Sequence, residues 1–106
     1  MWEYNTANGN WTKKSGFPEP PRCSSAFFSI DNYGYYGCGM QPDLTQFKDM
    51  WRYNPSNNKL IRIEDFPGGL RSHLIGSTVG QYGFVGLGLL QYPVTYFKDF
   101  WKFNPR

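Results

Sequence analysis

The sequence predicts an all-β repeat protein built from short antiparallel meanders of four strands. The segment 47–55 (FKDMWRYNP) returns as 97–105 (FKDFWKFNP), and a shorter third copy begins at Trp2. The equivalent tryptophans Trp2, Trp51 and Trp101 are 49 and 50 residues apart, and periods of about 20 to 50 residues indicate solenoids or propellers. Aromatic residues make up 20% of the chain, with 12 Gly and 8 Pro, which favours strands and turns over long helices or disorder.

The repeat extends over nearly the whole chain. Placing residue i over residue i+49 from Trp2 to Thr45 gives eleven identities, most of them aromatic residues, glycines and turn formers. We therefore expect a single unit over 1–106, with repeats at about 2–50 and 51–100 and the start of a third at 101–106. The positions expected to form the structural core of the repeat are Trp2, Trp11, Trp51, Trp101, Tyr53, Gly37, Gly39, Gly86 and Gly88.

The first two strands of each meander follow a Phe-Pro turn. Strand A is expected at 22–30 and 71–79, and it ends at DNYG (31–34) or GQYG (80–83), where Gly supplies the positive φ of a tight turn. Strand B is expected next, at 35–39 and 84–88. The loops that follow strand B, 40–46 and 89–96, differ in sequence and length.

The last two strands of each meander surround the tryptophan motif. Strand C is expected at 48–54 and 98–104, with Trp51 and Tyr53 on one face and Met50 and Arg52 on the other. An Asn-Pro-Ser-Asn-Asn turn leads into strand D at 59–63, whose first-copy counterpart is 10–14. A Phe-Pro pair closes strand D, because Pro cannot continue a ladder.

The order of these strands is C-D, A-B-C-D, A-B-C. A four-stranded antiparallel meander of this kind is one blade of a propeller. The chain therefore predicts one complete blade between two partial ones, with nine strands for the eight places in two blades. We expect a short terminal segment to be displaced, disordered or exchanged with a neighbouring copy.

The two cysteines are predicted to be free. In a hairpin that turns near Asn32, Cys23 and Cys38 are four residues out of register. That offset is roughly 13 Å at about 3.3 Å per residue, which is too far for a disulfide. Their second-copy counterparts are Ser72 and Leu87, so neither thiol belongs to the repeat.

Charge and composition exclude several classes of function. The net charge of +3 comes from basic and acidic residues scattered singly, without the clusters that nucleic acids or anionic membranes require. The sequence has no apolar run of membrane-spanning length and no signal-peptide pattern at its start, so we expect a soluble chain and leave its compartment open. His73 is the only histidine, so no metal or other cofactor is predicted.

The motifs together resemble kelch repeats. The resemblance is carried by Trp-x-Tyr-Asn-Pro, the Phe-Pro ahead of Arg22 and Arg71, the Tyr-Gly-Tyr/Phe strand and the Gly-x-Gly pair. Kelch repeats usually have adjacent glycines where this chain has Gly-x-Gly, and a strand-D Trp that Trp11 keeps and Leu60 replaces. Some kelch relatives are copper oxidases or sialic-acid epimerases. The copper ligands have no counterpart here, and an enzyme would need His73 or the two arginines with acids from another subunit.

Two blades cannot bury both of their apolar faces, because propellers close with about four to eight blades. Either the chain assembles with copies of itself or it is part of a longer propeller. Two-blade chains close only even rings: four blades as a dimer, six as a trimer and eight as a tetramer. Six- and seven-bladed rings are common among the kelch proteins that the chain resembles, and only six is even, so a homotrimer is favoured, with the tetramer next.

Ligand recognition is expected at one end of the blades, in the dissimilar B–C loops, because variable loops on a rigid scaffold often bind partners. The alternative is that these loops merely tolerate variation. The resemblance implies that Arg22 and Arg71 line a channel mouth and contact acidic peptides. Alternatively, each arginine pairs with Asp49 or Asp99 within the blades. The non-catalytic scaffold would then bind an acidic peptide or carbohydrate, or be a building block without a ligand. The candidate binding residues are Arg22, Arg71, Asp43, Gln91, Tyr92 and Tyr96.

Overall fold

The computed structural model describes residues 1–14, 16 and 21–105. Over these ranges the chain is all-β without helices, which confirms the predicted class. The Phe-Pro turn of the first copy, most of the 19–21 loop and Arg106 lie outside the described residues. The strands are β1 (Trp2–Asn5), β2 (Asn10–Lys13), β3 (Ala26–Ile30), β4 (Tyr33–Gly37), β5 (Met50–Asn54), β6 (Lys59–Ile63), β7 (Ile75–Val79), β8 (Tyr82–Gly86), β9 (Leu89–Leu90), β10 (Thr95–Tyr96) and β11 (Phe100–Phe103).

Strands β3 to β6 form one four-stranded antiparallel sheet in sequence order. This sheet is the complete A-B-C-D meander that the sequence predicts, and β6 has the predicted bounds. Strand β4 begins at Tyr33, two residues earlier than expected, because Asp31 adopts a positive φ of 53° and tightens the turn. The hairpin register changes accordingly: Cys23 lies opposite Met40, so it is two residues out of register with Cys38, not four. Both cysteines are free, as predicted.

Strands β7, β8 and β11 form a three-stranded sheet in the order β11-β8-β7. Its register repeats that of the first sheet: Gly86 pairs with Ile75 and Phe100, as Gly37 pairs with Ala26 and Met50. Among the described residues no fourth strand borders β11. The strands β1 and β2 instead form a separate exposed hairpin, and β9 and β10 form a small hairpin inside the second B–C loop.

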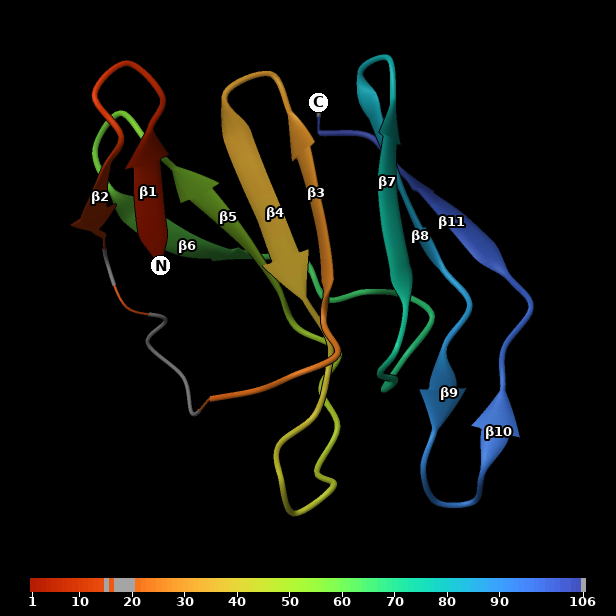
Figure 1. The fold of residues 1–106 in the computed structure, drawn as a ribbon. Helices are drawn as coiled ribbons and strands as arrows, with labels where there is room; N and C mark the ends of the chain where they lie inside the picture. Colours follow the sequence, from red (N-terminus) through yellow and green to blue (C-terminus); the bar gives the residue numbers. More distant parts are fainter. Residues whose placement is uncertain (15, 17–20, 106) are drawn as a thin grey trace.

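The two larger sheets pack face to face, with β3 beside β7 (Figure 1). Phe28 stacks on Tyr35 at a ring-centroid distance of 5.1 Å, and Phe103 of the second sheet lies 5.7 and 5.0 Å from these two rings. Gly83 permits this packing, because a Cβ there would lie 2.3 Å from the Phe28 ring. The core between the sheets is therefore aromatic and closely fitted.

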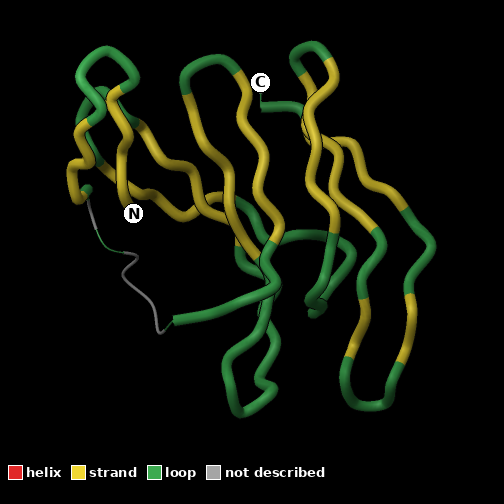
Figure 2. Tube along the Cα trace, in the orientation of Figure 1, coloured by secondary structure: helices red, strands yellow, loops and turns green. Residues whose placement is uncertain are grey.

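The connections divide between the two ends of the molecule. Tight turns join β3 to β4 and β7 to β8 at one end, and the loops that follow β4 and β8 extend from the other (Figure 2). This is the alternation expected of meanders, and it places both B–C loops at the same end. The described part of the chain contains no helix that is long and apolar enough to cross a membrane.

Candidate functional site

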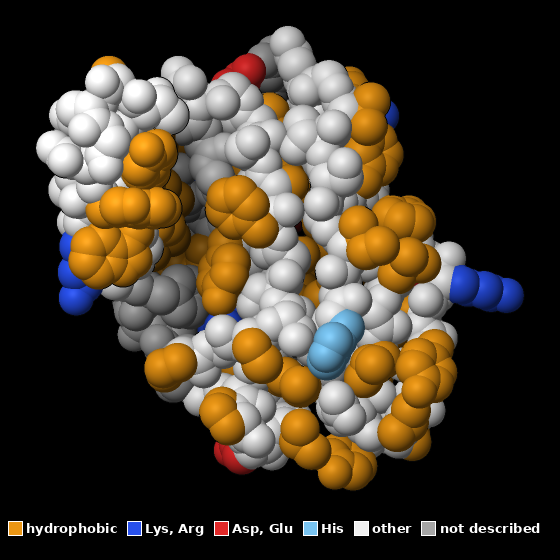
Figure 3. Space-filling model, in the orientation of Figure 1, with side chains coloured by type: hydrophobic (Ala, Val, Ile, Leu, Met, Phe, Trp, Pro, Cys, Tyr) orange, Lys and Arg blue, Asp and Glu red, His pale blue; other side chains and the backbone are white. Residues whose placement is uncertain are grey.

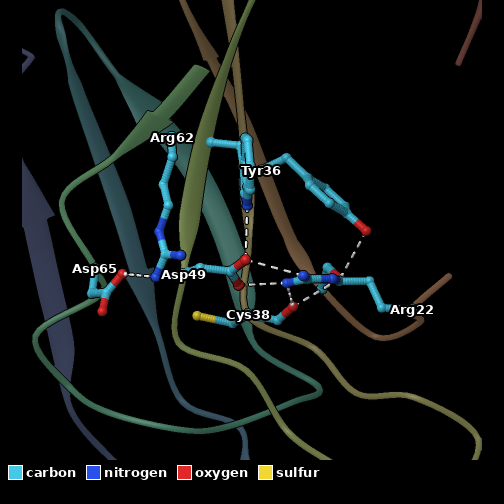
Figure 4. Close-up of polar contacts among 8 residues, drawn as sticks. Arg22, Tyr36, Cys38, Asp49, Arg62 and Asp65 are labelled. Atoms are coloured by element: carbon cyan, nitrogen blue, oxygen red, sulfur yellow. Dashed lines mark hydrogen bonds and ion pairs between the residues drawn. The ribbon is translucent and has the colours of Figure 1, made fainter. Parts of the chain in front are cut away.

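An arginine is held where three consecutive strands of the first sheet begin or end. Arg22 donates from Nη1 to Asp49 Oδ1 at 2.5 Å and from Nη2 to Asp49 Oδ2 at 3.0 Å (Figure 4). Its Nη1 also donates to the carbonyl of Cys38 at 3.1 Å, and its guanidinium lies 3.9 Å from the ring centroid of Phe47. Trp51 Nε1 donates to Asp49 Oδ2 at 2.8 Å. We call Arg22, Phe47, Asp49 and Trp51 the first cluster.

The second sheet repeats this arrangement bond for bond. Arg71 donates to the two carboxylate oxygens of Asp99 at 2.6 and 3.2 Å and to the carbonyl of Leu87 at 3.1 Å. Its guanidinium lies 3.7 Å from the centroid of Phe97, and Trp101 Nε1 donates to Asp99 at 2.8 Å. Arg71, Phe97, Asp99 and Trp101 form the second cluster. The pairing of each arginine with an aspartate, raised above as the alternative to ligand binding, is thus observed in both repeats.

The Gly-x-Gly pairs make room for these clusters. An added Cβ at Gly37 would lie 2.2 Å from the carbonyl oxygen of Asp49, and one at Gly86 would lie 2.2 Å from that of Asp99. Strand B therefore approaches the residue before strand C too closely for any side chain. The later glycines, Gly39 and Gly88, have positive φ values of 92° and 85°, a conformation that glycine adopts without strain.

The two clusters differ in exposure. The side chain of Asp49 is 9% exposed and that of Asp99 is 38% exposed. Both arginine side chains are buried. In the first sheet β6 lies beside β5, and Arg62 of β6 lies next to Asp49 (Figure 4). In the part of the chain that the structure describes, no strand occupies that place beside β11.

The aspartates are counterions, not proton donors. Burial by itself raises the pKa of Asp49, but hydrogen bonds from Arg22 and Trp51 and the charge of Arg22 outweigh it, so the pKa lies below its usual value. The hydrogen bond from Arg71 is the main cause that lowers the pKa of Asp99. Burial raises the pKa of Cys38 to about 12, so this thiol is not a nucleophile near neutral pH.

The tryptophans expected in the repeat core have different surroundings. Trp51 is buried, whereas Trp101 lies on β11, beside which no further strand is described, and is exposed. Trp2 and Trp11 lie on the separate β1–β2 hairpin and are also exposed. Tyr53 is partly buried and donates a hydrogen bond to Asn58 at 2.8 Å. Of the four tryptophans, all within the described residues, Trp51 alone is shielded from solvent.

The candidate residues of the loops fall into two groups. Tyr92 and Tyr96 on the β9–β10 hairpin are 74% and 78% exposed. Gln91 is tied to the other loop, since its backbone N–H donates to Gln46 Oε1 at 2.8 Å. Asp43 accepts a hydrogen bond from the backbone of Thr45, which lowers the pKa of Asp43 and closes a local turn. The structure therefore joins the two B–C loops, but it does not bring the arginines to their exposed tyrosines.

A polar chain between the repeats escaped the sequence analysis. Gln46 Nε2 donates to Ser72 Oγ at 3.0 Å, and Ser72 Oγ lies 3.1 Å from His73 Nδ1. His73 Nε2 lies 3.3 Å from Ser24 Oγ, and the His73 backbone N–H donates to the Ser24 carbonyl. Ser24 and His73 are repeat counterparts, and they meet because β3 and β7 of the two sheets lie side by side. Both ring nitrogens of His73 face hydroxyl groups, so these polar residues bridge the two sheets.

No group of three or more His, Cys, Asp or Glu residues that could hold a metal ion occurs among the described residues. No protein-family model matches the chain, and no curated protein matches it either.

Proposed function

We propose that the chain is a non-catalytic propeller module of kelch type, which closes a ring with further copies of itself and serves as a scaffold for binding a protein or another ligand. The observation that carries the proposal is the repetition of one structural unit. The first and second clusters have the same bonds, and the two sheets that hold them stack face to face with their loops at the same end.

Stacking of this kind supports a ring because it covers only one face of each sheet. The first sheet is covered on the face that carries Phe28 and Tyr35. The second sheet is covered on the face that carries Val85 and Phe103, which is not the repeat counterpart of the first face. Each sheet therefore keeps one uncovered face. Repetition of the same step closes a propeller after about four to eight blades, so three copies would give six blades and four copies eight.

The end that carries the B–C loops is the proposed recognition surface. Tyr92 and Tyr96 project on the β9–β10 hairpin, and Val94 between them is also exposed. Exposed aromatic rings of this kind suit the apolar face of a sugar or a peptide side chain. The arginines of the two clusters support the blades in this proposal, because their guanidinium groups already bind Asp49 and Asp99.

The first experiment is the native mass of the purified chain, by light scattering and native mass spectrometry across a range of concentrations. A discrete three- or four-fold multiple of 12.3 kDa is the expected result. A monomer at every concentration would overturn self-assembly. The remaining interpretation would be that the chain is part of a longer propeller.

A binding screen tests the scaffold role separately. Acidic peptides and glycans are tested for saturable binding to the assembled chain and to Tyr92→Ala and Tyr96→Ala variants. Loss of binding with unchanged native mass is expected. Asn57→Ala is the control, because Asn57 is exposed in the turn between β5 and β6, at the end of the molecule away from the B–C loops. Absence of any saturable ligand would favour a building block that binds nothing.

A further inference from the structure

The two uncovered faces are defined by the strand registers, because residues paired across strands share a face. On the second sheet the uncovered face, which we call the outer face, carries Ile75, Ser77, Val79, Tyr82, Phe84, Phe100 and Lys102. On the first sheet the uncovered face, which we call the receiving face, carries Phe27, Ser29, Gly34, Tyr36, Trp51, Tyr53, Leu60 and Arg62. Apolar side chains are exposed on both sides of the stacked sheets (Figure 3).

Apart from Lys102 on the outer face and Arg62 on the receiving face, both faces are mainly apolar. Val79 is 65% exposed and Phe100 is 56% exposed on the outer face. The receiving face borders an apolar cavity of ≈290 Å³, lined by Phe27, Tyr36, Tyr53 and Leu60 with Met1 at its side. Contiguous exposed surfaces of this kind mark interaction sites.

We infer that the outer face of one copy packs on the receiving face of a second copy, in the arrangement that already joins the two sheets within the chain. This inference rests on the proposed function and assigns its interface. The repeat supplies the template: the covered face of the first sheet has its counterparts on the outer face, and the covered face of the second sheet has its counterparts on the receiving face. The resulting contact is head-to-tail, which generates a closed ring when the rotation fits.

The polar contact of the internal interface can be reproduced between copies. Within the chain Thr78 Oγ1 donates to the carbonyl of Ser29 at 2.6 Å. The repeat counterpart of Ser29 is Thr78, and that of Thr78 is Ser29. In the second copy the hydroxyl of Ser29 would therefore donate to the carbonyl of Thr78, with the same atoms in the same roles.

The aromatic contact is also reproduced. Within the chain the ring of Tyr35 lies 5.0 Å from that of Phe103. Their counterparts are Phe84 on the outer face and Tyr53 on the receiving face. An aromatic pair thus meets at the same place in both interfaces, with the tyrosine and phenylalanine exchanged between the two sides.

Large and small side chains are exchanged in a complementary way. Within the chain the ring of Phe28 fills the space over Gly83. On the outer face Ser77 replaces Phe28, and on the receiving face Phe27 covers Gly34 with its ring, 3.4 Å from the position of an added Cβ. At this position the aromatic ring between copies is thus Phe27 of the receiving face, whereas within the chain it is Phe28 of the first sheet's covered face. Phe27 also brings a Cβ where Gly76 has none, so the second copy's β3 must lie slightly further from β7 than the chain's own β3 does.

Charged substitutions on the two faces test the inference. Phe84→Lys and Tyr53→Glu should each reduce the native mass from the ring to 12.3 kDa, because every interface then buries an unpaired charge. The double variant places the two charges opposite each other and should recover the ring. Val94→Lys changes a more exposed apolar residue on the β9–β10 loop and should leave the mass unchanged.

The outcomes separate this inference from the proposed function. If the wild type forms a ring that both single variants retain, the interface is wrong but self-assembly stands. A monomeric wild type overturns both. Circular dichroism verifies that each variant folds. Should one fail to fold, a Cys23→Ser, Tyr53→Cys, Phe84→Cys variant treated with a short thiol cross-linker gives the second test. A ladder of covalent multimers is expected, and cross-linked monomer alone would overturn the interface.

Discussion

The first and second clusters contain the same four residue types in the same contacts, yet solvent reaches them differently. Asp49 is nearly buried, and Asp99 is more than one-third exposed. The bonding of each cluster is therefore determined inside a single sheet, by the ends of strands A, B and C. Its burial depends on the fourth strand: β6 lies beside β5 in the first sheet, and no strand has that place beside β11 among the described residues.

The difference in exposure predicts that the two ion pairs contribute differently to the free energy of unfolding. A buried pair gains little over an apolar contact, but removal of one partner leaves an uncompensated charge, which costs about 3–5 kcal/mol. An exposed pair is weakened by water and salt and contributes about 1 kcal/mol or less. Because only the aspartate differs in exposure, the same Arg–Asp bond should contribute more to stability in the first sheet than in the second.

The largest expected effect is that of Asp49→Asn. Because Arg22 remains buried with its carboxylate partner neutralised, the free energy of unfolding should fall by about 3 kcal/mol. Asp99→Asn, the matched variant in the second cluster, also leaves a buried arginine, but Asp99 is 38% exposed and water can replace its carboxylate oxygens, so the loss should be smaller than that of Asp49→Asn. Urea denaturation at low protein concentration measures both, and equal losses would show that burial is not the relevant difference.

A second pair of variants compares equivalent glycines on a covered and an uncovered face. Gly83→Ala places a Cβ 2.3 Å from the Phe28 ring, and such overpacking costs about 1–3 kcal/mol. At Gly34 the nearest atoms are 3.4 Å away, so Gly34→Ala should change stability by about 0.5 kcal/mol or less. Thermal denaturation of the two variants measures the gap. A stable Gly83→Ala protein would mean that the sheets are not as closely packed as the structure has them.

Much of the first sheet could be predicted from the sequence, because its strands are short, regular and punctuated by turn residues. Strand β6 has the predicted bounds, and the strand order follows from the short connections. The A–B turn could not be located as well. The positive φ of Asp31, a non-glycine residue, moves the turn toward the N-terminus and changes the register by two residues.

The site was less predictable, because its contacts depend on which segments lie side by side. The pairing of Arg22 with Asp49 could be raised as an alternative, since both residues recur near strand ends. The polar contacts among Gln46, Ser72, His73 and Ser24 could not be predicted, because they cross between the two repeats and use residues that differ between them. The β9–β10 hairpin was missed because its two-residue strands have no periodicity to detect.

A third prediction concerns acid. The pKa values of Asp49 and Asp99 lie below their usual value in the folded chain. The stability that these carboxylates contribute is therefore fully present above the unfolded pKa of about 4 and is lost as the pH falls through the lower folded values. The free energy of unfolding should decline below about pH 4. Asp49→Asn should flatten that decline more than Asp99→Asn, and an unchanged slope in both would contradict the assignment.

The smallest expected effect is on thiol reactivity, and it probes the clusters without changing their stability. Cys23 is exposed and Cys38 is fully buried beside the first cluster, where burial raises its pKa to about 12. An aromatic disulfide reagent at about pH 8 should therefore label one thiol per native chain and two after unfolding. Rapid labelling of both thiols in the native chain would contradict the burial of Cys38.

The matched position in the second sheet sharpens this measurement. Leu87 is the counterpart of Cys38, and its carbonyl likewise accepts a hydrogen bond from an arginine. Leu87 is only partly buried, so a Cys23→Ser, Cys38→Ser, Leu87→Cys variant should be labelled faster than Cys38 in a Cys23→Ser chain. If copies assemble as proposed, the labelling of this variant should slow as the protein concentration rises, because a neighbouring copy then covers the second blade. A rate independent of concentration would show that the second cluster stays open in solution.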